Sequence, residues 1–196
     1  MSREITFVHL TDLHIGDHVT DDHLFSDTQE TLREILALVA TIEPKPSFLV
    51  ASGDLSNRGD AESYEILKGI MESIDLPVVY ALGNHDTREG FYRGMLGRAD
   101  NLDAPYFHDR VIDGVHVVAL DSSTPGFIGG SLRPSSSSSA ALASLPSSYT
   151  ARKPGSTTVV PEARKALSPP QASSTLTVLS VAGTIWLATV RFQTSS

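Results

Sequence analysis

The sequence predicts an α/β fold in which a mainly parallel sheet is covered by helices. Through residue 120, short apolar runs alternate with stretches whose apolar residues recur at helical spacing. Three strand-then-helix units come first, and a pair of strands follows them. That order is typical of a parallel sheet whose crossover connections are helices.

The first two strands and the first helix are predicted within residues 5–51. Residues 5–10 (ITFVHL) form an apolar, partly β-branched run that predicts a buried strand. Ser26 followed by Gln29 resembles a capping box and predicts the start of a helix, which Pro44 ends. Residues 48–51 then predict the second strand.

The next helix is predicted to begin at Asp60, a residue type that caps helices, and to end before Pro77. Asp113-Gly114 is a favourable turn pair and predicts a hairpin. The remaining predicted elements are a strand over 78–82, a short helix over 87–96, and hairpin strands over 106–112 and 115–120.

Polar residues follow the predicted strands at the points where the strands end. Asp12 and His14 follow the first strand, Asp54 follows the second, and Asn84 and His85 follow the third. The carboxyl ends of parallel strands form one rim, so these side chains should converge. Each motif alone could be ordinary turn chemistry, but three of them on one sheet favour a metal site. Oxygen and imidazole ligands suit Mn²⁺, Fe, Zn²⁺ or Mg²⁺.

The other histidines are expected to lie outside this cluster. His9 is inside the first strand and is expected to pack in the core. His108 and His116 fall in the hairpin and are expected at the surface. For His18 and His23, in an acidic loop, a solvent-facing and a substrate-facing position both stay open.

These motifs carry a family resemblance that runs from about residue 5 to residue 132. The motifs are Asp12-Leu13-His14, Gly53-Asp54 and Gly83-Asn84-His85-Asp86. In that order and spacing they resemble the first three motifs of the calcineurin-like metallophosphoesterases. The flanking residues, such as GDLSNRGDAESY and LDSSTPGFIGGSL, resemble the bacterial class III cyclic nucleotide phosphodiesterases and their glycerophosphodiesterase relatives.

The resemblance implies a role for each matching residue. Asp12 and His14 would hold the first metal, and Asp54 would bridge two metals. Asn84 would bind the second metal and approach the phosphate. His85 would protonate the leaving alkoxide or stabilise its charge, with Asp86 orienting the His85 ring.

The activity implied is hydrolysis of 3′,5′-cyclic nucleotides such as cAMP, or of small phosphodiesters, by a metal-bound hydroxide at a dinuclear site. The two divalent ions would be Fe, Mn or Zn, with Mg a poorer fit. The family's later histidine ligands have no counterpart, because no histidine follows His116. The second metal should therefore bind weakly and the activity should be impaired. Alternatives are a glycerophosphodiesterase or another phosphatase of the superfamily, a non-catalytic metal-binding remnant, or a poorly folding product.

The composition changes sharply where the resemblance stops. The first 130 residues hold 9 Lys and Arg against 22 Asp and Glu, whereas the last 66 hold 6 against 1. The last 66 also contain 16 Ser and 8 Thr. We therefore expect an N-terminal half of the metallophosphoesterase sandwich over 1–132 and a low-complexity Ser/Thr/Pro-rich tail over 133–196. A change of reading frame and a genuine Ser-rich tail both remain open as its origin.

Two further expectations concern the tail. Residues 133–174 should be mostly irregular, because they combine a serine run with several prolines and lack apolar periodicity. Residues 176–190 are apolar but too short for a membrane span, and would instead form one or two strands pairing with an open sheet edge.

The charge and composition also restrict location and partners. A net charge of −8 disfavours a nucleic-acid or anionic-membrane partner. The chain has no cysteine and no signal-peptide pattern at its start, so a cytoplasmic location is expected. The expected partner is a small phosphodiester substrate, and a homodimer is left open.

Overall fold

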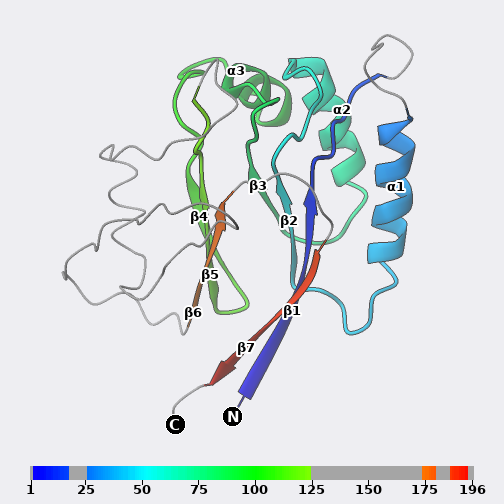
Figure 1. Ribbon diagram of the computed structural model, residues 1–196, viewed down its shortest axis with the longest axis vertical. Helices are drawn as coiled ribbons and strands as arrows, with labels where there is room; N and C mark the ends of the chain where they lie inside the picture. Colours follow the sequence, from blue (N-terminus) through cyan, green and yellow to red (C-terminus); the bar gives the residue numbers. More distant parts are fainter. Residues whose placement is uncertain (1, 18–25, 125–173, 180–185, 194–196) are drawn as a thin grey trace, which may run out of the picture.

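A computed structural model of the chain describes residues 2–17, 26–124, 174–179 and 186–193 (Figure 1). The strands are β1 (Ser2–Thr11), β2 (Phe48–Ser52), β3 (Val78–Ala81), β4 (His108–Ile112), β5 (Val115–Leu120), β6 (Ser174–Leu179) and β7 (Trp186–Gln193). The helices are α1 (Thr28–Val39), α2 (Ala61–Met71) and α3 (Arg88–Gly90), and α3 continues into the π-helical turn η1 (Phe91–Met95).

The larger sheet has the strand order β3-β2-β1-β7. Strands β1, β2 and β3 are parallel, as the sequence predicts, and β7 runs antiparallel to β1. Thr11 is aligned with Ser52, and Ser52 is aligned with Ala81. The three parallel strands therefore end level with one another, and the residues that follow them share one rim.

A second sheet covers one face of the first. It has the order β4-β5-β6, with the hairpin β4–β5 joined at the predicted Asp113-Gly114 turn. Its apolar residues pack with those of the first sheet in one core cluster: Ile5, Phe7, Phe48, Val50, Val79, Ala81, Val115, Val117 and Ala119. The element order alone predicts a single sheet covered by helices, whereas the family resemblance implies a sandwich, and the two sheets of the structure confirm the sandwich. The central strands are apolar on both faces, so each face needs a cover.

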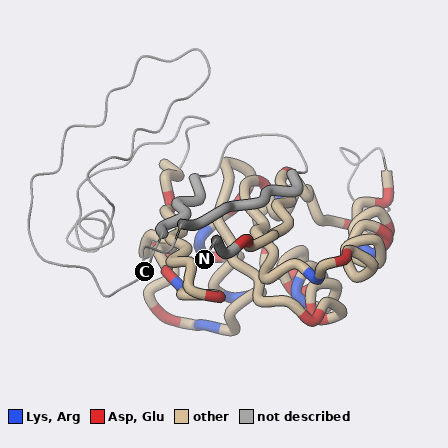
Figure 2. Tube along the Cα trace, turned by 90° about the horizontal axis from the view of Figure 1, so that it is seen from below, with Lys and Arg blue, Asp and Glu red and all other residues tan. Residues whose placement is uncertain are grey.

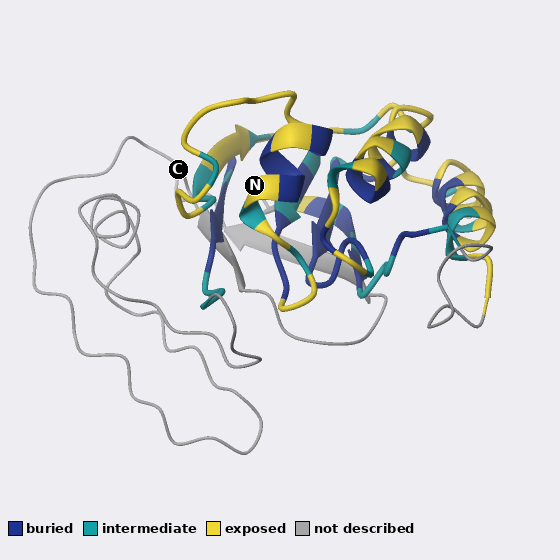
Figure 3. Ribbon diagram, turned by 90° about the horizontal axis from the view of Figure 1, so that it is seen from above, coloured by how far each residue is buried: buried dark blue, intermediate teal, exposed yellow. Residues whose placement is uncertain are grey.

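The helices cover the opposite face of the larger sheet, and their exposed sides point away from it (Figure 3). Helix α1 is capped by Asp27, whose Oδ1 accepts a hydrogen bond from the Glu30 backbone N–H at 3.0 Å. The prediction of Ser26 as the cap is therefore wrong by one residue. The predicted cap of α2 is confirmed, because Asp60 Oδ1 accepts from the Ser63 backbone N–H at 2.9 Å.

Two strands of the fold come from the compositionally distinct tail. β7 pairs with β1, and β6 pairs in parallel with β5. The prediction that residues 176–190 supply strands to open sheet edges is confirmed. The expectation of irregular structure over 133–174 falls almost wholly outside the described residues. Among the described residues, no helix is long and apolar enough to cross a membrane.

Acidic and basic positions are interspersed over the described part of the chain (Figure 2).

On the hairpin, His116 Nε2 lies 2.7 Å from Asp109 Oδ2, and the His116 side chain is only 17% exposed. His108 is half-buried, and its Nδ1 is a buried atom for which the described residues offer no hydrogen-bond partner. The prediction that both histidines lie at the surface is therefore wrong. The His116 ring contacts Asp109 across the hairpin, and the His108 ring packs against Tyr106.

The buried ring of His108 should make the protein acid-sensitive. Burial lowers the pKa of His108 to about 4, with Arg110 adding to the shift and Asp109 opposing it. The unfolded chain binds this proton near pH 6.5, so the folded state binds fewer protons between the two values. The contribution of the neutral His108 ring to the free energy of unfolding should be fully present above pH 6.5. It should fall by about 1–3 kcal/mol as the pH drops toward 4.

Urea unfolding across this pH range tests the expectation, with His108→Phe as the comparison. Phenylalanine keeps the ring and cannot titrate, so its stability should depend less on pH. An equal acid loss in the variant would contradict the assignment to His108.

Candidate metal centre

Two loops run side by side at the rim where β1 and β2 end. The Asp12 backbone N–H donates to the Gly53 carbonyl at 3.1 Å, and the His14 N–H donates to the Asp54 carbonyl at 2.8 Å. A third hydrogen bond, from Ile15 N–H to Leu55 O at 3.0 Å, continues the ladder. The loop after β1 is thereby locked against the loop after β2.

Three side chains of these loops point to one place. Asp12, His14 and Asp54 each offer a ligand atom, and these atoms all lie within 4.8 Å of one another. His14 Nε2 is 3.9 Å from Asp54 Oδ2. Asp54 is buried, whereas Asp12 and His14 are half-buried. The predicted convergence of these three residues is confirmed.

The same three residues have left-handed backbone conformations, with φ of 57° at Asp12, 44° at His14 and 39° at Asp54. A non-glycine residue in this region carries a backbone cost of about 1 kcal/mol or more. Such cost persists where surrounding structure enforces it and is concentrated at functional sites. Here the inter-loop hydrogen bonds enforce it, and the result is that the three side chains face one another.

The loop after β3 joins this group through the Asp54 carboxylate. The His85 backbone N–H donates to Asp54 Oδ1 at 2.9 Å. The His85 and His14 rings are edge-to-face, with centroids 4.9 Å apart. Asn84 lies between Gly83 and His85 on this loop and is exposed. The loop therefore brings Asn84 to the rim, while its role as a ligand stays a prediction.

Gly83 is required for this close approach. A Cβ atom built on Gly83 would collide with the backbone nitrogen and Oδ1 of Asp54 and with the Gly53 backbone carbon. A larger residue would therefore separate the loop after β3 from Asp54.

The Asp86 carboxylate connects the loops after β2 and β3 through the hydrogen bonds that it accepts. Its Oδ1 accepts hydrogen bonds from the Ser56 N–H at 3.0 Å and the Tyr64 hydroxyl at 2.7 Å. Its Oδ2 accepts from the Leu55 N–H at 3.0 Å and the Gly83 N–H at 2.7 Å. Burial raises the pKa of Asp86, and these hydrogen bonds oppose the rise.

This arrangement corrects the expectation that Asp86 orients the His85 ring. The His85 Nδ1 lies 3.0 Å from the backbone oxygen of Asn57, while the Asp86 carboxylate is engaged by Tyr64 and three backbone N–H groups. Sequence adjacency suggested the pairing of Asp86 with His85. In the structure, Asp86 turns toward the loop after β2 because that loop presents unpaired donors.

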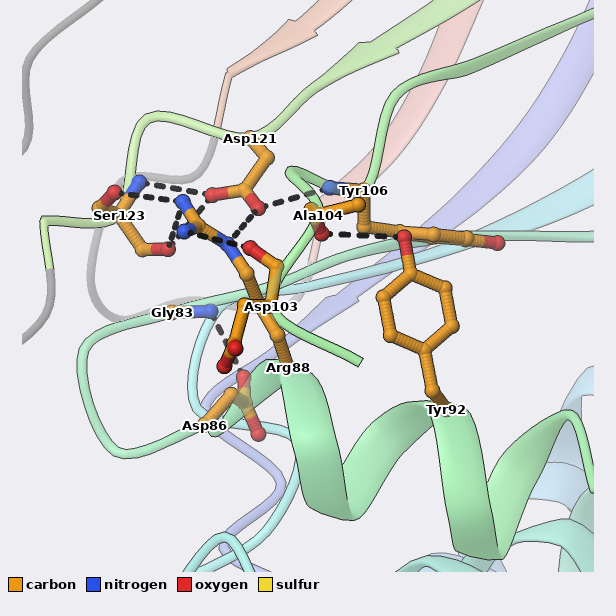
Figure 4. A network of polar contacts seen from close by, with 9 residues as sticks. All are labelled: Gly83, Asp86, Arg88, Tyr92, Asp103, Ala104, Tyr106, Asp121 and Ser123. Carbon is orange, nitrogen blue, oxygen red and sulfur yellow. Dashed lines mark hydrogen bonds and ion pairs between the residues drawn. The ribbon is translucent and has the colours of Figure 1, made fainter. Parts of the chain in front are cut away.

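A second network, which the motifs did not reveal, lies beside the site (Figure 4). Arg88 Nε donates to Asp121 Oδ2 at 2.8 Å, and its Nη2 and Nη1 donate to the carbonyls of Ser123 and Asp103. Burial alone would raise the pKa of Asp121. Hydrogen bonds from Arg88, Ser123 and the Tyr106 N–H outweigh burial and hold that pKa below its usual value. Arg88 thus anchors the segment after β5.

The remaining histidines are placed as follows. His9 is half-buried, its Nε2 lies 2.6 Å from Ser52 Oγ, and burial lowers its pKa. It bridges β1 and β2 and takes no part in the group at the rim. His18 and His23 lie outside the described residues.

The donor set suits a divalent cation. Two carboxylates and one imidazole, without a thiolate, match the preferences of Mn²⁺, Fe²⁺ and Zn²⁺. A carboxylate–imidazole group at the carboxyl rim of a helix-covered sandwich defines a class of metal-binding α/β proteins. The family described as calcineurin-like phosphoesterase matches residues 5–154, and the chain belongs to this family.

Curated relatives agree with the family assignment. The chain is 38% identical over 125 residues to a probable cyclic nucleotide phosphodiesterase of Rhodococcus erythropolis. The aligned region covers 61% of this chain and 40% of that protein. It is 30% identical over 131 residues to a cAMP/cGMP dual specificity phosphodiesterase of Mycobacterium tuberculosis, covering 60% and 41%. It is 26% identical over 121 residues to a probable glycerophosphodiester phosphodiesterase of Arcobacter nitrofigilis, covering 61% and 44%. The chain thus spans less than half the length of these relatives.

Proposed function

We propose that this chain is a metal-dependent phosphodiesterase that acts on 3′,5′-cyclic nucleotides. The observation that carries the proposal is the convergence of Asp12, His14 and Asp54 with ligand atoms within 4.8 Å. These residues would hold a divalent cation, and Asn84 would add an amide oxygen from the loop after β3. The names of the Rhodococcus and Mycobacterium relatives support the substrate class.

When bound, the cation supplies positive charge that polarises the phosphoryl oxygens and acidifies a water ligand. The chain's own residues supply position and proton transfer. Asp54 holds the loop after β3 through the His85 N–H, which keeps Asn84 at the rim. The His85 ring is held at Nδ1 by a carbonyl, so Nε2 is the nitrogen that, when the ring is doubly protonated, would donate a proton to the leaving alkoxide.

We further propose that the activity of this chain is impaired and that its second metal binds weakly. Within the described residues the ligand group has three members, enough for one cation. The family resemblance places more histidine ligands downstream, and no histidine follows His116. Two cations share the charge stabilisation at phosphorus, so loss of one should cost about 10²-fold or more in rate.

A second candidate function is hydrolysis of glycerophosphodiesters, which the name of the Arcobacter relative favours. A third is metal binding without turnover, which the shortage of downstream ligands favours. The substrate proposed in both catalytic cases is a small molecule in the cytoplasm rather than a nucleic acid, in keeping with the net charge of −8. A homodimer remains compatible with the proposal.

A metal titration combined with hydrolysis assays tests the proposal. Calorimetry with Mn²⁺ should show one tightly bound ion per chain and a weaker second ion. Cyclic AMP, cyclic GMP and a glycerophosphodiester are then assayed at saturating Mn²⁺, with Asp12→Ala as the inactive control.

We expect slow hydrolysis that favours the cyclic nucleotides and disappears in Asp12→Ala. Tight binding without turnover would support the non-catalytic candidate. Fast turnover that the variant abolishes would show that the site is complete. Absence of saturable Mn²⁺ binding would overturn the proposal.

A further inference from the structure

Asn57 contacts both histidines of the site, although no sequence motif singled it out. Its side-chain Oδ1 lies 3.2 Å from His14 Nδ1. Its backbone oxygen lies 3.0 Å from His85 Nδ1. Asn57 therefore contacts the Nδ1 atom of each of two histidines, and these histidines come from different loops.

The chemistry of these contacts determines where the ring protons lie. A backbone carbonyl can only accept a hydrogen bond, so His85 Nδ1 must carry a hydrogen to make this contact. An amide oxygen likewise only accepts, so the Asn57 Oδ1 contact calls for a hydrogen on His14 Nδ1. In a neutral imidazole the other nitrogen, Nε2, then keeps its lone pair.

The position of His14 Nε2 favours this assignment over the reverse one. If the Asn57 amide were turned round, its NH₂ group would donate to Nδ1 and the ring hydrogen would sit on Nε2. That hydrogen would face Asp54 Oδ2, but the 3.9 Å separation is too long for a hydrogen bond. The reverse tautomer therefore gains no hydrogen bond at Nε2, and the contact with Asn57 Oδ1 decides which nitrogen carries the hydrogen.

We propose that Asn57 is a positioning residue that holds His14 and His85 in the Nδ1–H tautomer, His14 through its side chain and His85 through its backbone. Both rings then present Nε2 toward the rim. The significance of this tautomer for catalysis rests on the proposed function. The tautomer itself is a property of the metal-free protein.

The backbone of Asn57 is anchored independently of its side chain. The Asn57 N–H donates to the Ile15 carbonyl at 3.0 Å, and the preceding Ser56 N–H donates to Asp86 Oδ1 at 3.0 Å. Truncation of the side chain should therefore leave the carbonyl beside His85. The two contacts can be separated by mutation, and His85 serves as an internal control.

Long-range ¹H–¹⁵N spectra of the histidine rings test the proposal in the metal-free protein at a pH where imidazole is neutral. His14→Gln and His85→Gln variants assign the two sets of signals. In the unchanged chain both rings should show the Nδ1–H pattern. In Asn57→Ala, His14 should shift to mixed tautomers or to Nε2–H, while His85 should keep its pattern.

Asn57→Asp provides the rescue, because a carboxylate oxygen also accepts from Nδ1, and it should restore the His14 pattern. Mn²⁺ affinity should fall about 10–100-fold in Asn57→Ala, as it does when other partners of metal-binding histidines are lost, and should recover in Asn57→Asp. An unchanged His14 tautomer in Asn57→Ala, or an Nε2–H pattern in the unchanged chain, would overturn the proposal.

The readouts separate this proposal from the proposed function. If the tautomers respond as expected but Mn²⁺ does not bind, the positioning role stands and the proposed function fails. If Mn²⁺ binds tightly and the His14 tautomer ignores the substitution, the positioning role fails alone. A changed His85 pattern in Asn57→Ala would show that the carbonyl had moved and would contradict the claim that the two contacts are independent.

Discussion

Replacing Asp54 with asparagine is expected to lower the affinity for Mn²⁺ by more than about 100-fold. Loss of a residue that only orients a ligand costs about 10–100-fold, and loss of a ligating charge should exceed that. Asparagine keeps an oxygen that can accept from the His85 N–H, so the loop contact at 2.9 Å can persist. The effect should therefore fall on metal binding rather than on folding.

Asp75→Asn is a matched control for this experiment. Asp75 is fully exposed, pairs with Lys45 at 2.9 Å, and precedes β3, at the opposite end of the sheet from the rim. The same change of charge there should leave the Mn²⁺ affinity measured by calorimetry almost unchanged. Equal losses of Mn²⁺ affinity in both variants would show that the change of net charge causes the effect and that Asp54 is not a metal ligand.

Replacing Asp86 with alanine is expected to destabilise the fold by about 3–5 kcal/mol, because four buried or half-buried donors lose their acceptor. These donors are the backbone N–H groups of Leu55, Ser56 and Gly83 and the Tyr64 hydroxyl. The loss is a large fraction of the roughly 5–15 kcal/mol by which native domains are stable.

Tyr64→Phe provides the graded comparison, since it removes one of the four donors and retains the ring that packs against Phe91. We expect a cost of about 1 kcal/mol for this change. Urea unfolding of the two variants beside the unchanged chain measures both values. A small effect of Asp86→Ala would mean that the residue does not clamp the loops, and a direct role beside His85 would regain support.

The sequence predicted the convergence of Asp12, His14 and Asp54 because strand direction alone places these residues at one rim. It did not predict the partners that hold the site in shape. The contact between His14 and Asn57 spans 43 residues, and the Arg88–Asp121 pair spans 33. Such pairs leave no local pattern, because they depend on how the loops are packed and not on spacing along the chain.

The fold shows the same division between local and non-local signals. The cap at Asp60 and the turn at Asp113-Gly114 follow from local chemistry, and both occur as predicted. The second sheet depends on packing between distant strands, so the order of elements did not reveal it. The sequence paired Asp86 with its neighbour His85, whereas three of the four donors to the Asp86 carboxylate lie 22 to 31 residues away along the chain.

The pairing of β1 with β7 has a consequence for how the protein reaches its folded state. Ser2 is aligned with Gln193 and His9 with Trp186, whereas β1 meets β2 after a much shorter stretch of chain (Figure 1). Closing a loop on the order of 180 residues costs about 1 kcal/mol more than closing one of roughly 40. We therefore expect β1, β2 and β3 to assemble with their helices early and β7 to dock last. Until then one edge of β1 has unsatisfied backbone groups, and refolding at high concentration should lose material to aggregation through that edge.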